Sequence, residues 1–146
     1  MRNRLSKRLR IILAFLGVVL VIVGITNWLG GGLLRGLCEN QIVNEIFSPD
    51  NGTKAVVFER SCGATTGFST QVSLIKADNV LGDQGGNVFI ADTDHGKAPS
   101  APHGGPEVIL TWLGDRALRV SHHKDARIFA SVDKVGDIQI QFATFK

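Results

Sequence analysis

The chain has 146 residues, of which 44% are hydrophobic and 20% are charged, and it is long enough for one domain. Its formal net charge of +3 comes from the N-terminus. Five of the sixteen basic residues lie within residues 1–10, where no acidic residue occurs, whereas eleven basic and thirteen acidic residues follow from Arg35 onward. The later part has no basic stripe interleaved with aromatic residues, which excludes nucleic acid as an expected partner.

Residues 11–29 (IILAFLGVVLVIVGITNWL) form a nineteen-residue segment without charge, in which Thr26 and Asn27 are the only polar members. As a helix it would be about 28 Å long at ~1.5 Å per residue, close to the ~30 Å hydrocarbon core of a bilayer. A helix in a soluble protein would keep a polar face, and this segment has none. We therefore expect a transmembrane signal anchor at residues 11–29, with the lipid bilayer as its partner.

The charge around this segment predicts its orientation. Basic residues are retained on the cytoplasmic side of a membrane, so residues 1–10 are expected to form a cytoplasmic tail. Gly30, Gly31 and Gly32 are expected to end the helix and to begin a tether over residues 30–37, which leaves residues 38–146 outside the cytoplasm. A cleaved signal peptide is the alternative, although its apolar part would be unusually long and no Ala-x-Ala site follows.

Cys38 and Cys62 are the only cysteines, and both follow the expected anchor. Residues 41–47 and 54–60 are typical of two strands, and folding the chain about Asp50 sets position 38 opposite position 62. Opposed residues of antiparallel strands have Cα atoms ~4.5–5.5 Å apart, which suits a disulfide. We expect a Cys38–Cys62 disulfide, which persists in an oxidising compartment. The alternative is that Cys62 is a nucleophile.

Past residue 38 the chain consists of short apolar runs, most of them alternating with polar residues and separated by turn residues. These runs predict strands at residues 41–47, 54–60, 71–76, 87–91, 107–112, 117–122, 127–132 and 137–145. The expected fold is all-β: an antiparallel β-sandwich or barrel-like domain of about eight strands, preceded by one N-terminal transmembrane helix.

The strand at residues 117–122 also predicts the orientation of its side chains. Side chains alternate between the two faces of a strand, so Leu118, Val120 and His122 are expected to face the core. His123, which follows with the opposite parity, is expected to face water.

Residues 92–106 (DTDHGKAPSAPHGGP) hold three of the four prolines and no aliphatic residue larger than alanine. A long loop in a compact domain is uncommon and is often functional. Residues 62–70 are dense in glycine and hydroxyl side chains, but they lack the lysine of a phosphate-binding loop. From these segments and the end of the strand at 117–122 we take a candidate binding surface: Thr65, Thr66, Phe68, Asp92, Asp94, His95, His103 and His123.

No catalytic residue, cofactor or metal site is expected. Residues 92–96 (DTDHG) resemble the start of a calcium loop but lack its third acid and its closing glutamate. His122 and His123 point to opposite faces of a strand and cannot easily chelate one ion. A metal-binding domain stays an alternative, as does a hydrolase that uses Cys62 or a His/Asp pair such as His122 and Asp125. The sequence has no Gly-x-Ser-x-Gly motif.

Residues 46–59 (IFSPDNGTKAVVFE) are similar to the strand-turn-strand unit of TolB-type β-propeller repeats, in which Ser-Pro-Asp-Gly precedes an apolar strand. This chain has Asn51 inserted before the glycine, and the unit occurs once. A propeller needs several blades. The resemblance therefore supports a hairpin here and not a propeller.

Five blocks carry a broader resemblance: CENQIVNEIFSPD, KAVVFERSCGATTGFSTQVSLI, GNVFIAD, GGPEV and WLGDRALRVSHH. They resemble a family of small bacterial envelope proteins that have an N-terminal anchor or signal and a domain of unknown function. The resemblance implies an envelope location and transfers no activity or functional residue. We expect a non-enzymatic domain tethered to the bacterial cytoplasmic (inner) membrane, periplasmic or extracellular, that binds an envelope protein, a glycan or a small ligand.

Overall fold

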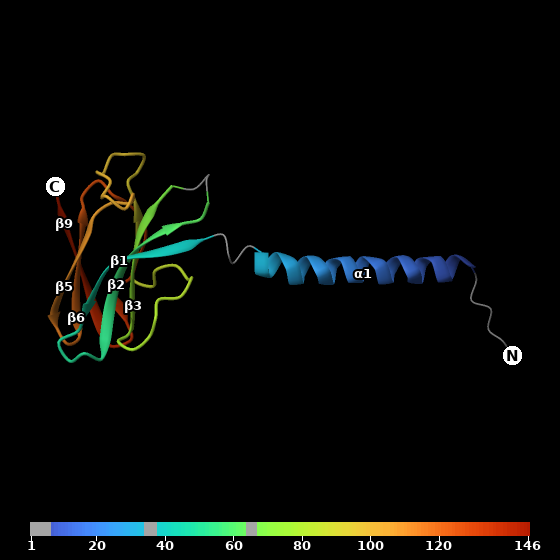
Figure 1. Ribbon diagram of the computed structural model, residues 1–146, viewed down its shortest axis with the longest axis horizontal. Helices are drawn as coiled ribbons and strands as arrows, with labels where there is room; N and C mark the ends of the chain where they lie inside the picture. The colour runs from blue at the N-terminus through green and yellow to red at the C-terminus, as the bar shows by residue number, and fades with distance from the viewer. Residues whose placement is uncertain (1–6, 34–37, 64–66) are drawn as a thin grey trace. The chain divides into compact units, whose positions relative to one another are not determined.

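The computed structural model describes residues 7–33, 38–63 and 67–146 (Figure 1). The chain divides into two compact units, Met1–Leu37 and Cys38–Lys146. The first unit contains one helix and the second contains only strands and the loops between them, within the described residues.

Helix α1 (Lys7–Leu33) has 27 residues. Its large apolar side chains from Ile12 to Ile25 are 41–70% exposed. In the described part of the chain, no helix is both long enough and apolar enough to cross a membrane. The prediction that Gly30–Gly32 end the helix was wrong, because α1 continues through these glycines to Leu33. The helix also starts before Ile11, at Lys7. Glycine lowers helix propensity by about 1 kcal/mol per residue but does not forbid the helical conformation.

The second unit forms two sheets from nine strands within its described residues (Figure 1). The strand order is β1-β2-β3-β4-β7 in the first sheet and β5-β6-β9-β8 in the second. The strands are β1 (Glu39–Phe47), β2 (Thr53–Ser61), β3 (Ser69–Lys76), β4 (Phe89–Asp92), β5 (Val108–Gly114), β6 (Ala117–His123), β7 (Arg127–Ser131), β8 (Lys134–Val135) and β9 (Ile138–Phe145).

The all-β prediction is confirmed, and each of the eight predicted strands corresponds to an observed one. The additional strand is β8, whose two residues pair with the start of β9 where only a turn was predicted. The expectation of purely antiparallel pairing was wrong, because β6 and β9 are parallel. After β6 the chain crosses to the first sheet to form β7, and it then returns through β8, so that β9 runs in the same direction as β6.

The hydrophobic core lies between the two sheets and makes the second unit a sandwich. The first sheet contributes buried residues from β2, β3 and β4, and the second from β5, β6 and β9. These residues are Ala55, Val57, Val72, Leu74, Phe89, Ala91, Leu110, Leu118, Val120, Ile138 and Ile140. Full burial of one aliphatic or aromatic side chain contributes about 1.5–3 kcal/mol, so this interface is the main stabilising element. His122 faces the core as predicted, with its ring centroid 5.1 Å from that of Phe89.

Strand β2 is buried on both of its faces. Val56 and Phe58 alternate with the core residues of the strand, so they lie on the opposite face, yet both are 0% exposed. The loop between β3 and β4, residues 77–88, is tied to this face. Arg60 Nη1 donates to the carbonyl oxygen of Asp83 at 2.7 Å. The side-chain amide of Asn40, on β1, donates to the carbonyl oxygens of Gly82 and Gln84.

The hairpin of β1 and β2 has the predicted turn and the predicted disulfide. Asn51 has φ +56°, and the Thr53 amide donates to Ser48 Oγ at 3.0 Å, which closes the turn. The Cys38–Cys62 disulfide directly continues the pairing of Glu39 with Ser61.

Candidate functional site

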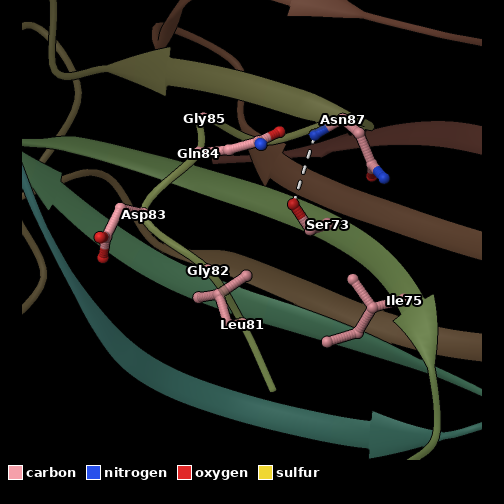
Figure 2. Close-up of a pocket in the computed structure, with 8 residues that line it drawn as sticks. All are labelled: Ser73, Ile75, Leu81, Gly82, Asp83, Gln84, Gly85 and Asn87. Atoms are coloured by element: carbon pink, nitrogen blue, oxygen red, sulfur yellow. Dashed lines mark hydrogen bonds between the residues drawn. The ribbon is translucent and has the colours of Figure 1, made fainter. Parts of the chain in front are cut away.

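The structure has a cavity of about 280 Å³ between strand β3 and the loop that follows it. Figure 2 shows Ser73 and Ile75 on the strand, with the loop from Leu81 to Gly85 beside them. Its polar groups hold the loop in place: Asn87 donates its backbone amide to Ser73 Oγ, and its side chain exchanges two hydrogen bonds of 2.9 Å with the backbone of Leu74. None of the candidate binding residues that the structure describes lines this cavity.

A second cavity, of about 450 Å³, combines three of the predicted surface residues. We name it the Phe68 depression. Its lining residues are Gly67, Phe68, Asp92, Thr93, His95, Gly104 and Arg127. Gly67 and Phe68 precede β3, Asp92 ends β4, and Arg127 begins β7, while the others belong to the long loop after β4. Phe68, Asp92 and His95 were predicted, so the two segments chosen from the sequence meet at one place in the fold.

The Asp92–Arg127 ion pair forms one wall of the depression. The two residues are partners in the β4–β7 pairing. Arg127 Nε donates to Asp92 Oδ1 at 3.1 Å, and Nη2 donates to Oδ2, which gives the two-point geometry that a guanidinium and a carboxylate favour. The Asp94 amide also donates to Asp92 Oδ1 at 2.8 Å. The ring of Phe129 lies 5.0 Å from the guanidinium carbon.

Electrostatics keep this pair charged. Burial raises the pKa of Asp92, but the hydrogen bonds from Arg127 and from the Asp94 amide outweigh it, so that the pKa of the carboxyl lies below its usual value. The same hydrogen bond raises the pKa of Arg127. Because its fork is already occupied by Asp92, Arg127 has limited capacity to bind an anionic ligand.

His95 is held at the depression by a tight turn. Asp94, His95 and Gly96 have φ values of +47°, +58° and +90°, a conformation that residues with side chains rarely adopt. Two backbone hydrogen bonds close the turn: the amides of Gly96 and Ala98 donate to the Thr93 carbonyl oxygen at 3.1 and 3.0 Å. A 2.6 Å hydrogen bond from Lys97 lowers the pKa of Asp94 and fixes that carboxylate. The exposed His95 imidazole is therefore presented by backbone of a defined shape.

Gly104 brings the long loop into close contact with Phe68 and Glu59. It has φ +105°, and a β-carbon at this position would lie 2.9 Å from Cγ and Cδ2 of Phe68 and 3.0 Å from Glu59 Oε2. The next residues are anchored as well, since Thr70 Oγ1 donates to the Pro106 carbonyl at 2.7 Å. Glu59 is only 6% exposed, and its Oε2 has no hydrogen-bond partner among the described residues.

Among the described residues, the predicted surface residues Asp94, His103 and His123 do not line the depression. The prediction that His123 faces water was wrong: its side chain is 13% exposed, because the parallel β6–β9 pairing sets it beside Phe145, whose ring centroid lies 6.0 Å away. His103 is half-buried, and its Nε2 has no hydrogen-bond partner in the described part of the chain. Thr65 and Thr66 lie outside the described residues.

In the part of the chain that the structure describes, the side chains named for the hydrolytic alternatives have other partners. Cys62 is in a disulfide and so offers no thiolate. His122 stacks on Phe89 in the core, with Nδ1 3.0 Å from the His123 carbonyl oxygen. Asp125 pairs with Lys124, which lowers the pKa of its carboxyl. Within residues 38–63 and 67–146, no three His, Cys, Asp or Glu side chains are placed to hold a metal ion.

Sequence reasoning missed Arg127, Thr93 and Glu59. Glu59 carries a recognisable signal, because it directly follows the continuous apolar run Ala55–Phe58, and such a run indicates a strand buried on both faces. Arg127 carries no comparable signal, since its role depends on the pairing of β4 with β7. No protein-family model, no curated protein and no solved structure matches this chain.

Proposed function

We propose that this chain is a non-enzymatic binding protein of the bacterial envelope, anchored in the cytoplasmic membrane by residues 11–29, whose outer domain binds a glycan in the Phe68 depression. The observation that carries the binding proposal is Phe68 itself, which is 50% exposed in a hollow that Asp92, Thr93, His95 and Arg127 also line. Binding pockets typically combine aromatic surface with a few oriented polar groups.

The ligand class is argued from the chemistry of the depression. An aromatic ring offers a flat apolar surface to the C–H groups of a sugar ring, and carboxylate, imidazole and hydroxyl groups exchange hydrogen bonds with sugar hydroxyls. Asp92, Thr93 and His95 supply these groups beside Phe68. An anionic ligand is disfavoured, because the cation of this wall, Arg127, is neutralised by Asp92.

The location is argued from the sequence and the disulfide. Residues 11–29 are uncharged and follow five basic residues, the pattern of an anchor with a cytoplasmic N-terminus. Disulfides are rare in the reducing cytosol and persist outside it, which fits a Cys38–Cys62 bond in the part of the chain that follows the anchor.

Binding is tested with the full-length chain in detergent, titrated with a panel of soluble oligosaccharides by isothermal calorimetry. Phe68→Ala should weaken binding of any oligosaccharide that binds the wild type by about tenfold or more, because stacking area is lost. Phe47→Ala is the matched control, since Phe47 is 49% exposed but lies on β1 and does not line the depression. Equal loss in both variants, or no binding by any member of the panel, would contradict the proposal.

The anchor is tested separately. Membranes from cells that produce the full chain are washed at alkaline pH, and intact cells or spheroplasts are treated with protease. We expect the chain to stay in the membrane pellet and the domain after residue 38 to be digested from outside. Release by the alkaline wash, or protection of the domain from the protease, would contradict an anchor with this orientation.

A further inference from the structure

We propose that Glu59 is the ion-pair partner for an unsubstituted amino group of the ligand, so that the depression selects an amino sugar. This inference rests on the proposed glycan-binding function. It concerns the buried carboxylate next to Gly104, a residue that lines the depression together with Phe68.

The Glu59 side chain is buried, and one of its carboxylate oxygens has no hydrogen-bond partner among the described residues. Its side chain shares the inner face of β2 with the core residues Ala55 and Val57 by the alternation of the strand, and the residue is 6% exposed. A buried charge is destabilising unless it is paired. The carboxylate oxygen without a described partner is Oε2.

On the opposite face of the same strand, a buried charge has a partner within the chain. Lys54 is buried at 9% exposure, and its Nζ lies 3.2 Å from Glu45 Oε1. Glu59 has no such ion pair in the described part of the chain. An unpaired charge retained beside a hollow is the pattern expected where a ligand supplies the partner.

Access from the depression is the second observation. Gly104 and Phe68 both line the depression, and the point at which a Gly104 β-carbon would lie is 3.0 Å from Glu59 Oε2 and 2.9 Å from two Phe68 ring atoms. Glu59 itself does not line the depression, but its Oε2 and the half-exposed Phe68 ring both lie next to Gly104. Side-chain rotation is the usual adjustment on binding, and a turned Phe68 ring would also present its face to a cation.

An organic ammonium group fits the Glu59 carboxylate better than a metal ion. A metal takes several protein ligands, and the described residues offer no cluster of three acidic, histidine or cysteine side chains. A primary ammonium group brings three N–H donors. One donor satisfies Glu59 Oε2, and the others remain for sugar or solvent oxygen atoms in the depression.

The test compares glucosamine trisaccharide with its N-acetylated form, with both titrated into the full-length wild type in detergent. We expect the free amine to bind about tenfold or more tightly, because a charge-assisted bond to Glu59 is lost on acetylation. In Glu59→Gln the two affinities should become equal. Equal affinities of the wild type for the two trisaccharides would overturn the inference, and this comparison needs no variant. A preference for the free amine that persists in Glu59→Gln would also overturn it.

Trilysine peptide is the third probe, since it carries the same amino group without a sugar. Binding of trilysine with none of the amino sugar would overturn the assignment to a glycan. If both trisaccharides bind equally and Phe68→Ala weakens both, only the role of Glu59 is overturned. If neither trisaccharide nor any other oligosaccharide binds, the proposed function itself fails.

A stability readout separates this role from a structural one. Thermal unfolding of the ligand-free chain should shift to higher temperature in Glu59→Gln, because a buried unpaired charge is removed. The matched variant Glu45→Gln should shift unfolding to lower temperature, because it leaves Lys54 without its partner. A decrease in Glu59→Gln as large as that in Glu45→Gln would show that Glu59 is paired in the free protein and would overturn the inference.

Discussion

Asp92 and Arg127 are 35 positions apart, yet they are direct partners across β4 and β7, and their side chains meet in a two-point ion pair. The pair stands where β4 passes into the long loop and where β7 begins. It joins the edge strand of the first sheet to the loop that carries His95 and Gly104. The geometry of the Phe68 depression therefore depends on this contact.

Arg127→Ala should lower the free energy of unfolding, and by more than Arg116→Ala does, since it leaves the partly buried Asp92 carboxylate without its main donor. Arg116→Ala is the matched control: Arg116 also pairs with an aspartate, Asp137, but both side chains are more than 60% exposed. Exposed pairs contribute little, so this variant should stay within about 0.5 kcal/mol of the wild type. Urea denaturation of both variants decides, and equal effects would contradict the structural role of Arg127.

Asp92 should make part of the stability depend on pH. Its pKa in the folded state lies below the ordinary value of 3.8, so its contribution is complete above that pH and is lost as the pH falls through the folded pKa. Denaturation at a series of pH values from 6 down to about 2.5 should show a steeper acid loss in the wild type than in Asp92→Asn. Arg127→Ala should also flatten the curve, because it removes the hydrogen bond that opposes the effect of burial. A slope unchanged in both variants would contradict this assignment.

Eight of the nine described strands were predictable, because each of them has its own pattern of apolar and polar residues in the sequence. Ile138 and Ile140, for example, alternate with glutamines and are the buried residues of β9. The order of the strands in the sheets was not predictable from such patterns. The pairing of β6 with β9 is parallel because β7, which lies between them in the sequence, belongs to the other sheet. Strand β8 was missed because two residues are too few to show any period.

The candidate site was predictable only in part. The composition of residues 92–106 pointed to Asp92 and His95, and the loop before β3 pointed to Phe68. No local sequence pattern indicates that residues 92–106 meet the loop before β3. Their close contact requires glycine at position 104, where a β-carbon would lie too near the Phe68 ring. The alternation of side chains along the strand predicted that His123 faces water. Its neighbour Phe145 results from the parallel pairing of β6 with β9, which no local sequence pattern indicates.

The disulfide should contribute substantially to stability. Replacing both Cys38 and Cys62 by serine removes a link with a sequence separation of 24, and this should lower the free energy of unfolding by about 3.5 kcal/mol in the chain-entropy description. Urea denaturation of the full chain measures the loss. Wild type treated with a reductant serves as the comparison and should approach the double variant. A loss below about 1 kcal/mol would show that the unfolded chain is already restricted without the bond.

Arg60 should keep the β3–β4 loop closed over Val56 and Phe58. Its Nη1 donates to Asn40 Oδ1 at 2.6 Å and to the Asp83 carbonyl at 2.7 Å. Arg60→Ala removes both bonds, so the loop amides near Asp83 should exchange hydrogen about tenfold faster or more, while core amides of β6 stay protected. Arg119→Ala, an exposed arginine on β6, is the control for loss of charge. Unchanged exchange near Asp83 would mean that other contacts hold the loop.

Gly104→Ala should damage both stability and the depression. The position has φ +105°, and the new β-carbon would lie 2.9 Å from the Phe68 ring and 3.0 Å from Glu59 Oε2, so both side chains or the loop must move. Backbone strain of this kind costs about 1–3 kcal/mol, and the displaced ring should weaken ligand binding in the same variant. Gly82→Ala is the matched control, because its β-carbon would meet no atom within 4 Å and it should be near neutral. Thermal unfolding and calorimetry of the two variants measure both effects, and equal behaviour would show that the close approach of Gly104 to Phe68 is not required.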